Sequence, residues 1–281
     1  EIILNEIKIT LRRGERVELR GFGVFSTNIQ KARISRNPKT GEKVHTPQKK
    51  LFTSKWLKTC LKNWIMKKNK IFVACDSTNI SKIKKIIKET QNSKIKFGYK
   101  FGLEFLNSRN GRAFLSNLKN KITFADLKLH DIPNTCVSTI KAIKDLNVNY
   151  LTIHISSGLE ALKAAKKVSG KIKLIGVSIL TSLDNKELKK IGFNKTIKHL
   201  VYQQAKLASK AKLDAIVCSA QEITTVKKVF KKEIITPGIR LSSEVNDQKR
   251  VLTPKQALKM GSDWLVIGRP ITKGNIKKNI L

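Results

Sequence analysis

The 281-residue sequence has few acidic residues, few cysteines and no long apolar run, and each shortage argues against a class of protein or a kind of site. No apolar run approaches the roughly 20 residues that a membrane-spanning helix needs, so we expect no membrane association. Four cysteines are scattered without the spacing of a metal site, which predicts free thiols in a cytoplasmic protein. Hydrophobic residues make up 40% of the chain, which is enough for a globular protein.

The shortage of acid leaves 58 basic residues against 20 acidic ones, a formal net charge of +38. Such an excess usually suggests a nucleic-acid partner. Only 11 of the basic residues are arginines, however, and six of these fall within the first 36 positions. Arginine suits phosphate and base-edge contacts better than lysine does. We therefore attribute the N-terminal basic residues to function, and most later lysines to the solvated surface of a protein encoded by an AT-rich genome.

Residues 1–58 differ from the rest in residue pattern, and they predict a small α+β fragment that carries a β-ribbon arm. Glu1–Arg13 has the apolar spacing of a helix, and short alternating strands follow it. The stretch Lys31–Lys50 is basic, with the residues of a hairpin tip at Asn37–Gly41. A ribbon of this kind can follow the phosphates of a groove while Pro38 wedges between base pairs and bends the duplex.

This segment resembles the HU/IHF family of bacterial DNA-bending proteins, through Gly14–Phe25 and Lys31–Lys43. The family's first helix and most of its second, which form its dimer core, are missing from the match. The resemblance therefore implies only weak, non-specific DNA binding through residues 1–58. The implied contacts come from Arg33, Arg36, Asn37, Pro38 and Lys39.

A basic linker, residues 59–69, leads to a second module at residues 70–281. Met66 is followed by lysines and a first strand, as at a natural start of translation. We interpret the chain as a fusion of neighbouring reading frames and expect the second module to work without the first.

The second module alternates apolar strands with amphipathic helices. The predicted strands are 71–75, 95–101, 122–127, 150–155, 174–180, 215–219, 233–237 and 264–268, and predicted helices include 80–89, 135–146, 158–168, 197–212 and 254–260. Eight strand–helix units in this length predict an α/β fold, a (β/α)8 TIM barrel. A doubly wound open sheet is the alternative, which the lack of a Gly-x-Gly-x-x-Gly motif after any strand disfavours.

Charged residues fall at the carboxyl ends of the predicted strands, where barrels of this kind carry their chemistry. Asp76 and Lys100 end the first two strands. Asp126 and Lys128 end the third and point to one face, with Asp131 in the loop beyond. A surface ion-pair cluster would explain an isolated Asp-x-Lys-x-x-Asp. A charged array at a strand end costs desolvation energy, however, and its placement here favours a functional site.

The loops after the seventh and eighth strands are the usual phosphate site of a TIM barrel. Arg240 follows the seventh strand, and Gly268 and Arg269 follow the eighth. Backbone N–H groups and guanidinium groups hold a phosphate dianion well. We therefore predict a phosphate site there, the alternative for Arg240 being a salt bridge at the rim.

The string Phe124–Thr135 resembles the active-site signature of the orotidine 5'-phosphate decarboxylase family, and the resemblance extends over residues 70–273. Further motifs follow in family order: Val73–Asp76, Lys100–Phe105, His154–Gly158, Gly176–Ser182, Val217–Glu222, Thr236–Arg240, Asp247–Gln248 and Val266–Thr272. One departure is Ser157, where the bacterial pattern usually has glycine.

The resemblance implies decarboxylation of orotidine 5'-monophosphate to UMP and CO2, in pyrimidine biosynthesis, with neither metal nor organic cofactor. It makes Lys128 the proton donor to C6, puts Asp126 near the departing carboxylate, and lets Lys100 and Asp131 hold Lys128. The implied substrate-binding residues are Asp76, Lys100, Thr135, Thr181, Arg240, Gln248, Gly268 and Arg269. In the family, Asp131 and Thr135 come from the partner subunit, which implies a homodimer with shared sites.

Two other functions stay open. One is an architectural DNA-bending protein with an inactive barrel. The other is a metal-dependent sugar-phosphate enzyme of the same barrel superfamily, which can share Asp-x-Lys-x-x-Asp. The full string His130–Thr135, the loop Leu180–Ser182 and Gln248 favour the decarboxylase.

Overall fold

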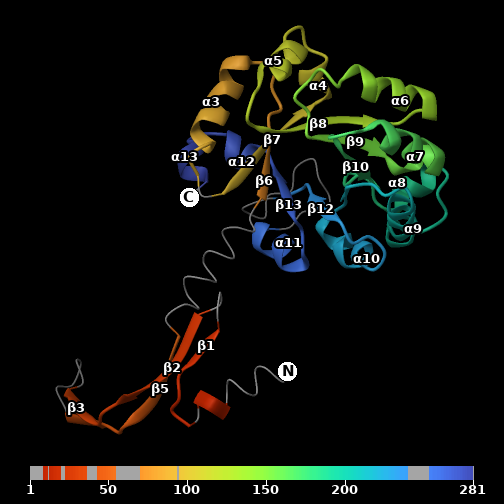
Figure 1. Ribbon diagram of the computed structural model, residues 1–281. Coiled ribbons are helices and arrows are strands. Elements are labelled where there is room, and N and C mark those ends of the chain that lie inside the picture. The colour runs from red at the N-terminus through yellow and green to blue at the C-terminus, as the bar shows by residue number, and fades with distance from the viewer. Residues whose placement is uncertain are drawn as a thin grey trace. The chain divides into compact units, whose positions relative to one another are not determined.

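The chain divides into two compact units, residues 1–67 and 68–281 (Figure 1). The computed structural model describes residues 9–11, 13–19, 23–36, 43–54, 70–93, 95–239 and 253–280. No helix in these stretches has both the length and the apolar character to cross a membrane.

The N-terminal unit contains two small antiparallel sheets. The larger has the order β1-β2-β5, and β3 pairs with β4 in the smaller. The bounds are Val17–Leu19 for β1, Gly23–Gln30 for β2, Arg33–Arg36 for β3, Lys43–Thr46 for β4 and Lys49–Ser54 for β5. The β3–β4 pair, in which Arg36 lies opposite Lys43, confirms the predicted ribbon, although its tip lies outside the described residues. Of the helix predicted over Glu1–Arg13, residues 9–11 are described and are helical.

The C-terminal unit is a closed barrel of eight parallel strands (Figure 1). Each strand pairs with the next along the chain, and the last, β13, pairs with the first, β6. The bounds are Lys70–Ala74 (β6), Lys96–Gly102 (β7), Ile122–Leu129 (β8), Tyr150–His154 (β9), Lys173–Val177 (β10), Ala215–Val217 (β11), Glu233–Thr236 (β12) and Trp264–Ile267 (β13). Closure confirms the predicted TIM barrel and shows that the open-sheet alternative is wrong.

Helices between the strands cover the outside of the barrel (Figure 1). Their bounds are Ile80–Thr90 (α3), Leu103–Leu106 (α4), Gly111–Asn117 (α5), Pro133–Ala142 (α6), Gly158–Val168 (α7), Asn185–Lys190 (α8), Ile197–Lys210 (α9), Ile223–Lys227 (α10), Pro254–Met260 (α11), Arg269–Thr272 (α12) and Ile276–Asn279 (α13), with 3-10 turns at Ile155–Ser157 (η1) and Ala220–Glu222 (η2). The helix predicted from position 135 begins two residues earlier, because Pro133 has the backbone angle that suits a first helical turn.

Helix α11 illustrates how local sequence sets these bounds. The Thr253 side chain accepts from the backbone N–H of Gln256, and the Gln256 side chain accepts from the backbone N–H of Thr253, which is a capping box. Gly261 then ends the helix in the left-handed conformation, at φ +102°.

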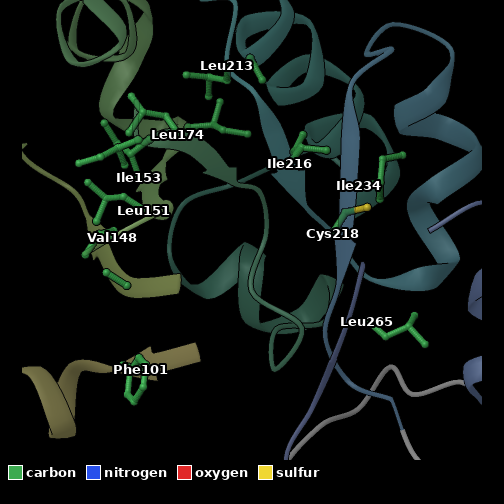
Figure 2. Close-up of a cluster of buried hydrophobic side chains, with 14 of the residues drawn as sticks. Phe101, Val148, Leu151, Ile153, Leu174, Leu213, Ile216, Cys218, Ile234 and Leu265 are labelled. Atoms are coloured by element: carbon green, nitrogen blue, oxygen red, sulfur yellow. The ribbon is translucent and has the colours of Figure 1, made fainter. Parts of the chain in front are cut away.

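Two apolar clusters follow the alternation of side chains along the strands. A small one fills the barrel with aromatic rings, where Phe72 stacks on Trp264 at 4.1 Å between centroids. The larger lies between strands and helices, and Figure 2 shows part of it, including Leu151 and Ile216. Gly98 permits the inner packing, since a Cβ there would lie 2.6 Å from a Phe72 ring carbon. The packed interior leaves the carboxyl end of the barrel for chemistry.

Candidate active site

A cavity of about 470 Å³ lies at the carboxyl ends of the barrel strands. Asp76, Lys100, Asp126 and Lys128, from β6 to β8 and the loop after β6, line it with charge. The lining from β10 to β13 is mostly apolar and includes Val177, Ile179, Val217, Pro237 and Val266. One wall therefore suits a charged reacting group, and the other suits a flat apolar ring.

The four charged side chains form an alternating array. The Lys128 ammonium donates to Asp126 Oδ2 at 2.9 Å. The Lys100 ammonium donates to Asp76 Oδ1 at 3.0 Å and lies 3.6 Å from Asp126 Oδ2. Asp126 is only 9% exposed, so its charge depends on these partners. These four residues, which the sequence analysis put at the carboxyl ends of three strands, thus lie together at one cavity, whereas Asp131 is not part of the array.

Lys100 and Lys128 differ in their surroundings. Burial alone would lower the pKa of Lys100, but the carboxylates of Asp126 and Asp76 outweigh burial, and the pKa of Lys100 is raised. The Lys100 side chain is 13% exposed, against 36% for Lys128. Lys100 is thus held between two carboxylates, while Lys128 has one carboxylate partner and a more exposed side chain.

The backbone at Lys128 is unusual. Its φ is +49°, in the left-handed region that costs a residue with a Cβ about 1–2 kcal/mol. Thr152 of β9 accepts the backbone N–H of Lys128 at 2.8 Å, and its hydroxyl donates to Asp126 Oδ1 at 3.1 Å. The sequence analysis missed Thr152. The available signal was a polar residue in the middle of the apolar strand Tyr150–His154, on the same face as His154.

Two histidines lie beside the array. The rings of His130 and His154 are 4.9 Å apart, and His130 Nε2 lies 3.2 Å from Ser156 Oγ. Burial, with the nearby charges of His130 and Lys128, lowers the pKa of His154, although Asp126 opposes the shift.

The remaining predicted residues divide into three groups. Thr181, Gly268 and Arg269 line the same cavity as the charged array. Asp131 and Thr135 are exposed at the start of α6, and Asp131 forms no ion pair with any described residue; its Oδ1 accepts the backbone N–H of Ile132 at 2.7 Å. Arg240 and Gln248 lie outside the described residues.

Of the five predicted DNA contacts, the structure describes the backbone of two. Arg33 and Arg36 belong to β3. Their side chains, and Asn37, Pro38 and Lys39 altogether, lie outside the described residues. As for metal sites, no three His, Cys, Asp or Glu side chains in the described parts of the chain are grouped as possible ligands.

The family model described as Orotidine 5'-phosphate decarboxylase / HUMPS family matches residues 69–279. The chain belongs to this family. A second model, for bacterial DNA-binding proteins, matches residues 1–63. Both resemblances drawn from the motifs are thereby confirmed.

Similar proteins agree with this family assignment. The orotidine 5'-phosphate decarboxylase of Wolbachia sp. subsp. Brugia malayi is 47% identical over 185 residues, which cover 64% of this chain and 82% of the relative. That of Carboxydothermus hydrogenoformans is 42% identical over 216 residues, covering 72% and 88%. Among solved structures, the orotidine 5'-phosphate decarboxylase of Lactobacillus acidophilus matches with a TM-score of 0.65 at 29% identity, over 76% of this chain and 96% of that chain.

Proposed function

We propose that this protein decarboxylates orotidine 5'-monophosphate to UMP and CO2, a step of pyrimidine biosynthesis, without metal or organic cofactor. The observation that carries the proposal is the array Asp76–Lys100–Asp126–Lys128 on one wall of a cavity that Gly268 and Arg269 also line. Family membership and the names of the relatives support it.

Loss of CO2 leaves the electron pair of the broken bond at C6 of the pyrimidine. Lys128 is the proposed acid at that carbon, because its side chain is ion-paired with Asp126, partly exposed and part of the cavity lining. Its positive charge stabilises the developing negative charge, and its proton then completes the new C6–H bond. Solvent returns a proton to the amine afterwards.

The rest of the array keeps Lys128 in place. Asp126 is bound by both lysines and would lie next to the departing carboxylate. Lys100 bridges Asp126 to Asp76, which we propose binds the ribose hydroxyls. Thr181 would contact the pyrimidine.

The proposed phosphate site is made by Gly268 and Arg269, which line the cavity after β13, together with Arg240 and Gln248. Binding energy from this remote phosphate can be expressed at the reacting carbon, because it holds the substrate against the charged wall.

We further propose a homodimer in which Asp131 and Thr135 of the partner subunit complete each site. Both residues are exposed in the single chain, and Asp131 has no ion-pair partner among the described residues. Ile132 between them is 66% exposed, as expected of a residue that a second subunit would cover.

We place the protein in the cytoplasm. Of the described cysteines, Cys75, Cys136 and Cys218 are all buried and form no disulfide, as is usual in a reducing compartment.

The decisive experiment mixes the purified protein with orotidine 5'-monophosphate and EDTA and follows the loss of orotate absorbance. Turnover that EDTA leaves unchanged is the expected result. If EDTA abolishes turnover and Mg²⁺ restores it, the sugar-phosphate alternative replaces this proposal. No turnover under any condition would favour the DNA-bending protein with an inactive barrel.

A second function, weak DNA binding that is independent of sequence, is proposed for the N-terminal unit. The match to bacterial DNA-binding proteins at residues 1–63 and the antiparallel β3–β4 pair favour it. Arg33, Arg36, Asn37 and Lys39 would contact phosphates while Pro38 wedges between base pairs, so retention on DNA should fall steeply with salt.

A further inference from the structure

The pairing of β8 with β9 is interrupted at the residues that carry the charged array. Phe124 lies opposite Tyr150 and Ala125 opposite Leu151, but the next pair joins Leu129 to Ile153. Three residues of β8, 126 to 128, therefore face a single residue of β9, Thr152. A bulge of this kind removes ladder hydrogen bonds and re-aims side chains.

The Thr152 hydroxyl makes two hydrogen bonds across the interruption in the β8–β9 pairing. It accepts the backbone N–H of Lys128 at 2.8 Å and donates to Asp126 Oδ1 at 3.1 Å. The direction of both bonds is fixed, because an amide N–H only donates and a carboxylate only accepts. Thr152 is 1% exposed, so water does not substitute for either bond.

These two bonds hold both ends of the Lys128–Asp126 pair. The backbone of Lys128 has φ +49°, a conformation that persists in a residue with a Cβ only when its surroundings impose it. That backbone sets where the ammonium points, and the ammonium in turn lies 2.9 Å from Asp126 Oδ2. Asp126 Oδ1 is the atom that Thr152 binds, so one hydroxyl fixes the lysine and its carboxylate together.

We propose that Thr152 is a positioning residue that aims Lys128 and Asp126 at the reacting carbon. The inference rests on the proposed decarboxylation. Thr152 is buried and is not among the residues that line the cavity, so it acts through Lys128 and Asp126 and not on the substrate itself.

A purely structural role makes a different prediction. A buried hydroxyl that only satisfies the Lys128 N–H would stabilise the fold, and its loss would lower Tm without changing the turnover of the folded protein. A positioning role predicts a loss of kcat while the phosphate end still binds.

The test compares Thr152→Val and Thr152→Ser with Thr123→Val in the full-length protein. Thr123 is a matched control, because it is buried on β8 and its hydroxyl likewise accepts a backbone N–H, that of Asn149, while it donates to Asn147 O and Asn149 Oδ1. It lies at the start of the strand, away from the array. The measurements are kcat, KM, the Kd of UMP and Tm.

Thr152→Val should lower kcat by about 100-fold, the scale expected when a reacting group is misplaced by about 1 Å. The Kd of UMP should stay unchanged, Thr152→Ser should restore kcat, and Thr123→Val should lower Tm only. If Thr152→Val does not fold, Thr152→Ala takes its place in the comparison with Thr152→Ser.

Unchanged kcat in the variant that lacks the hydroxyl would overturn the inference and leave the proposed decarboxylation standing. A Thr152→Ser variant as slow as Thr152→Val would also overturn it. If the wild-type protein itself does not turn over orotidine 5'-monophosphate, the proposed function and this inference both fail.

Discussion

The two ends of the barrel are built from the same kinds of charged residues and differ in what those residues face. At the amino end, Glu233 accepts a hydrogen bond from the Tyr150 hydroxyl at 2.9 Å and from the Lys173 ammonium at 3.2 Å. Lys70 lies 3.6 Å from the same carboxylate. At the carboxyl end, Lys100 and Lys128 alternate with carboxylates along the wall of a cavity.

At the amino end the charged groups are paired with one another. One carboxylate serves two ammonium groups and a phenol, and the ammonium groups also lie over aromatic rings, Lys70 at 5.4 Å from the Trp264 centroid and Lys173 at 5.1 Å from that of Tyr150. At the carboxyl end one side of the array faces the cavity. Charges whose partners surround them stabilise the fold, whereas charges that face a cavity are available to a substrate.

The largest effect should come from removing Lys128, the more exposed of the two lysines that line the cavity. Lys128→Ala should lose nearly all decarboxylation, because general acid catalysis alone is commonly worth about 100- to 10,000-fold. Binding of UMP, measured by titration calorimetry, should survive, since the phosphate end is unchanged. Lys173→Ala, at the closed amino end, is the control and should keep the wild-type kcat while folded.

A Lys128→Ala variant that keeps more than about a tenth of the wild-type rate would show that Lys128 is not the proton donor. Loss of UMP binding in the same variant would show that the lysine acts in binding.

Next in size is the recovery of activity from mixed subunits. Lys128→Ala and Asp131→Ala should each be inactive, and after subunit exchange in equal amounts about a quarter of wild-type activity should return, since half of the dimers are mixed and each has one intact site. Native mass spectrometry verifies the exchange. Verified exchange without activity would contradict the shared site.

At the amino end the expected effect is on stability. Glu233→Gln should lower the free energy of unfolding by about 1–3 kcal/mol, because Lys70 and Lys173 lose their carboxylate partner in a half-buried place. Urea unfolding measures it. The exposed pair Lys190–Glu187 is the control, and Glu187→Gln should change stability by less than about 0.5 kcal/mol. A Glu233→Gln variant with wild-type stability would mean that the ion pairs of Glu233 with Lys70 and Lys173 do not stabilise the fold.

The stabilisation by Glu233 should also depend on pH. Burial alone would raise the pKa of Glu233, but Tyr150, Lys173 and Lys70 outweigh it, and the pKa falls below its ordinary value of 4.5. The folded state therefore holds fewer protons than the unfolded state at this site. Its contribution is complete above pH 4.5 and is lost as the pH falls through the lower folded value. The stability difference between wild type and Glu233→Gln should shrink in that acidic range, and a difference that grows there would contradict this account.

The sequence predicted the carboxyl end better than the amino end for a physical reason. Asp126 and Lys128 lie two residues apart at the end of one strand, so the sequence predicted them close together, and the order of strands brings Lys100 and Asp76 beside them. Glu233 and Lys173 belong to strands far apart in the chain, and each alone looks like a solvated residue at a strand start. They come into contact only because β10, β11 and β12 pair side by side in this register.

Thr152 was missed for a similar reason. Alternation along β9 places it on the inner face, but the bulge that sets three residues of β8 against it depends on the pairing of two strands. The positive φ of Lys128 was also not predicted, since a lysine stands at position 128 where glycine or asparagine would signal the left-handed conformation.

The smallest expected effect on catalysis comes from removing the N-terminal unit. A shortened chain that starts at Met66 keeps every residue of both charged clusters. These are Lys70, Lys173 and Glu233 at the amino end of the barrel, and Asp76, Lys100, Asp126 and Lys128 at the carboxyl end. We expect unchanged decarboxylation and an unchanged urea midpoint, because each cluster finds its partners within residues 70–239. Retention on DNA at low salt should fall, since the basic β3–β4 ribbon is gone. A large drop in turnover or stability on shortening would show that the barrel depends on residues 1–65, and the interpretation of the chain as a fusion of independent reading frames would be wrong.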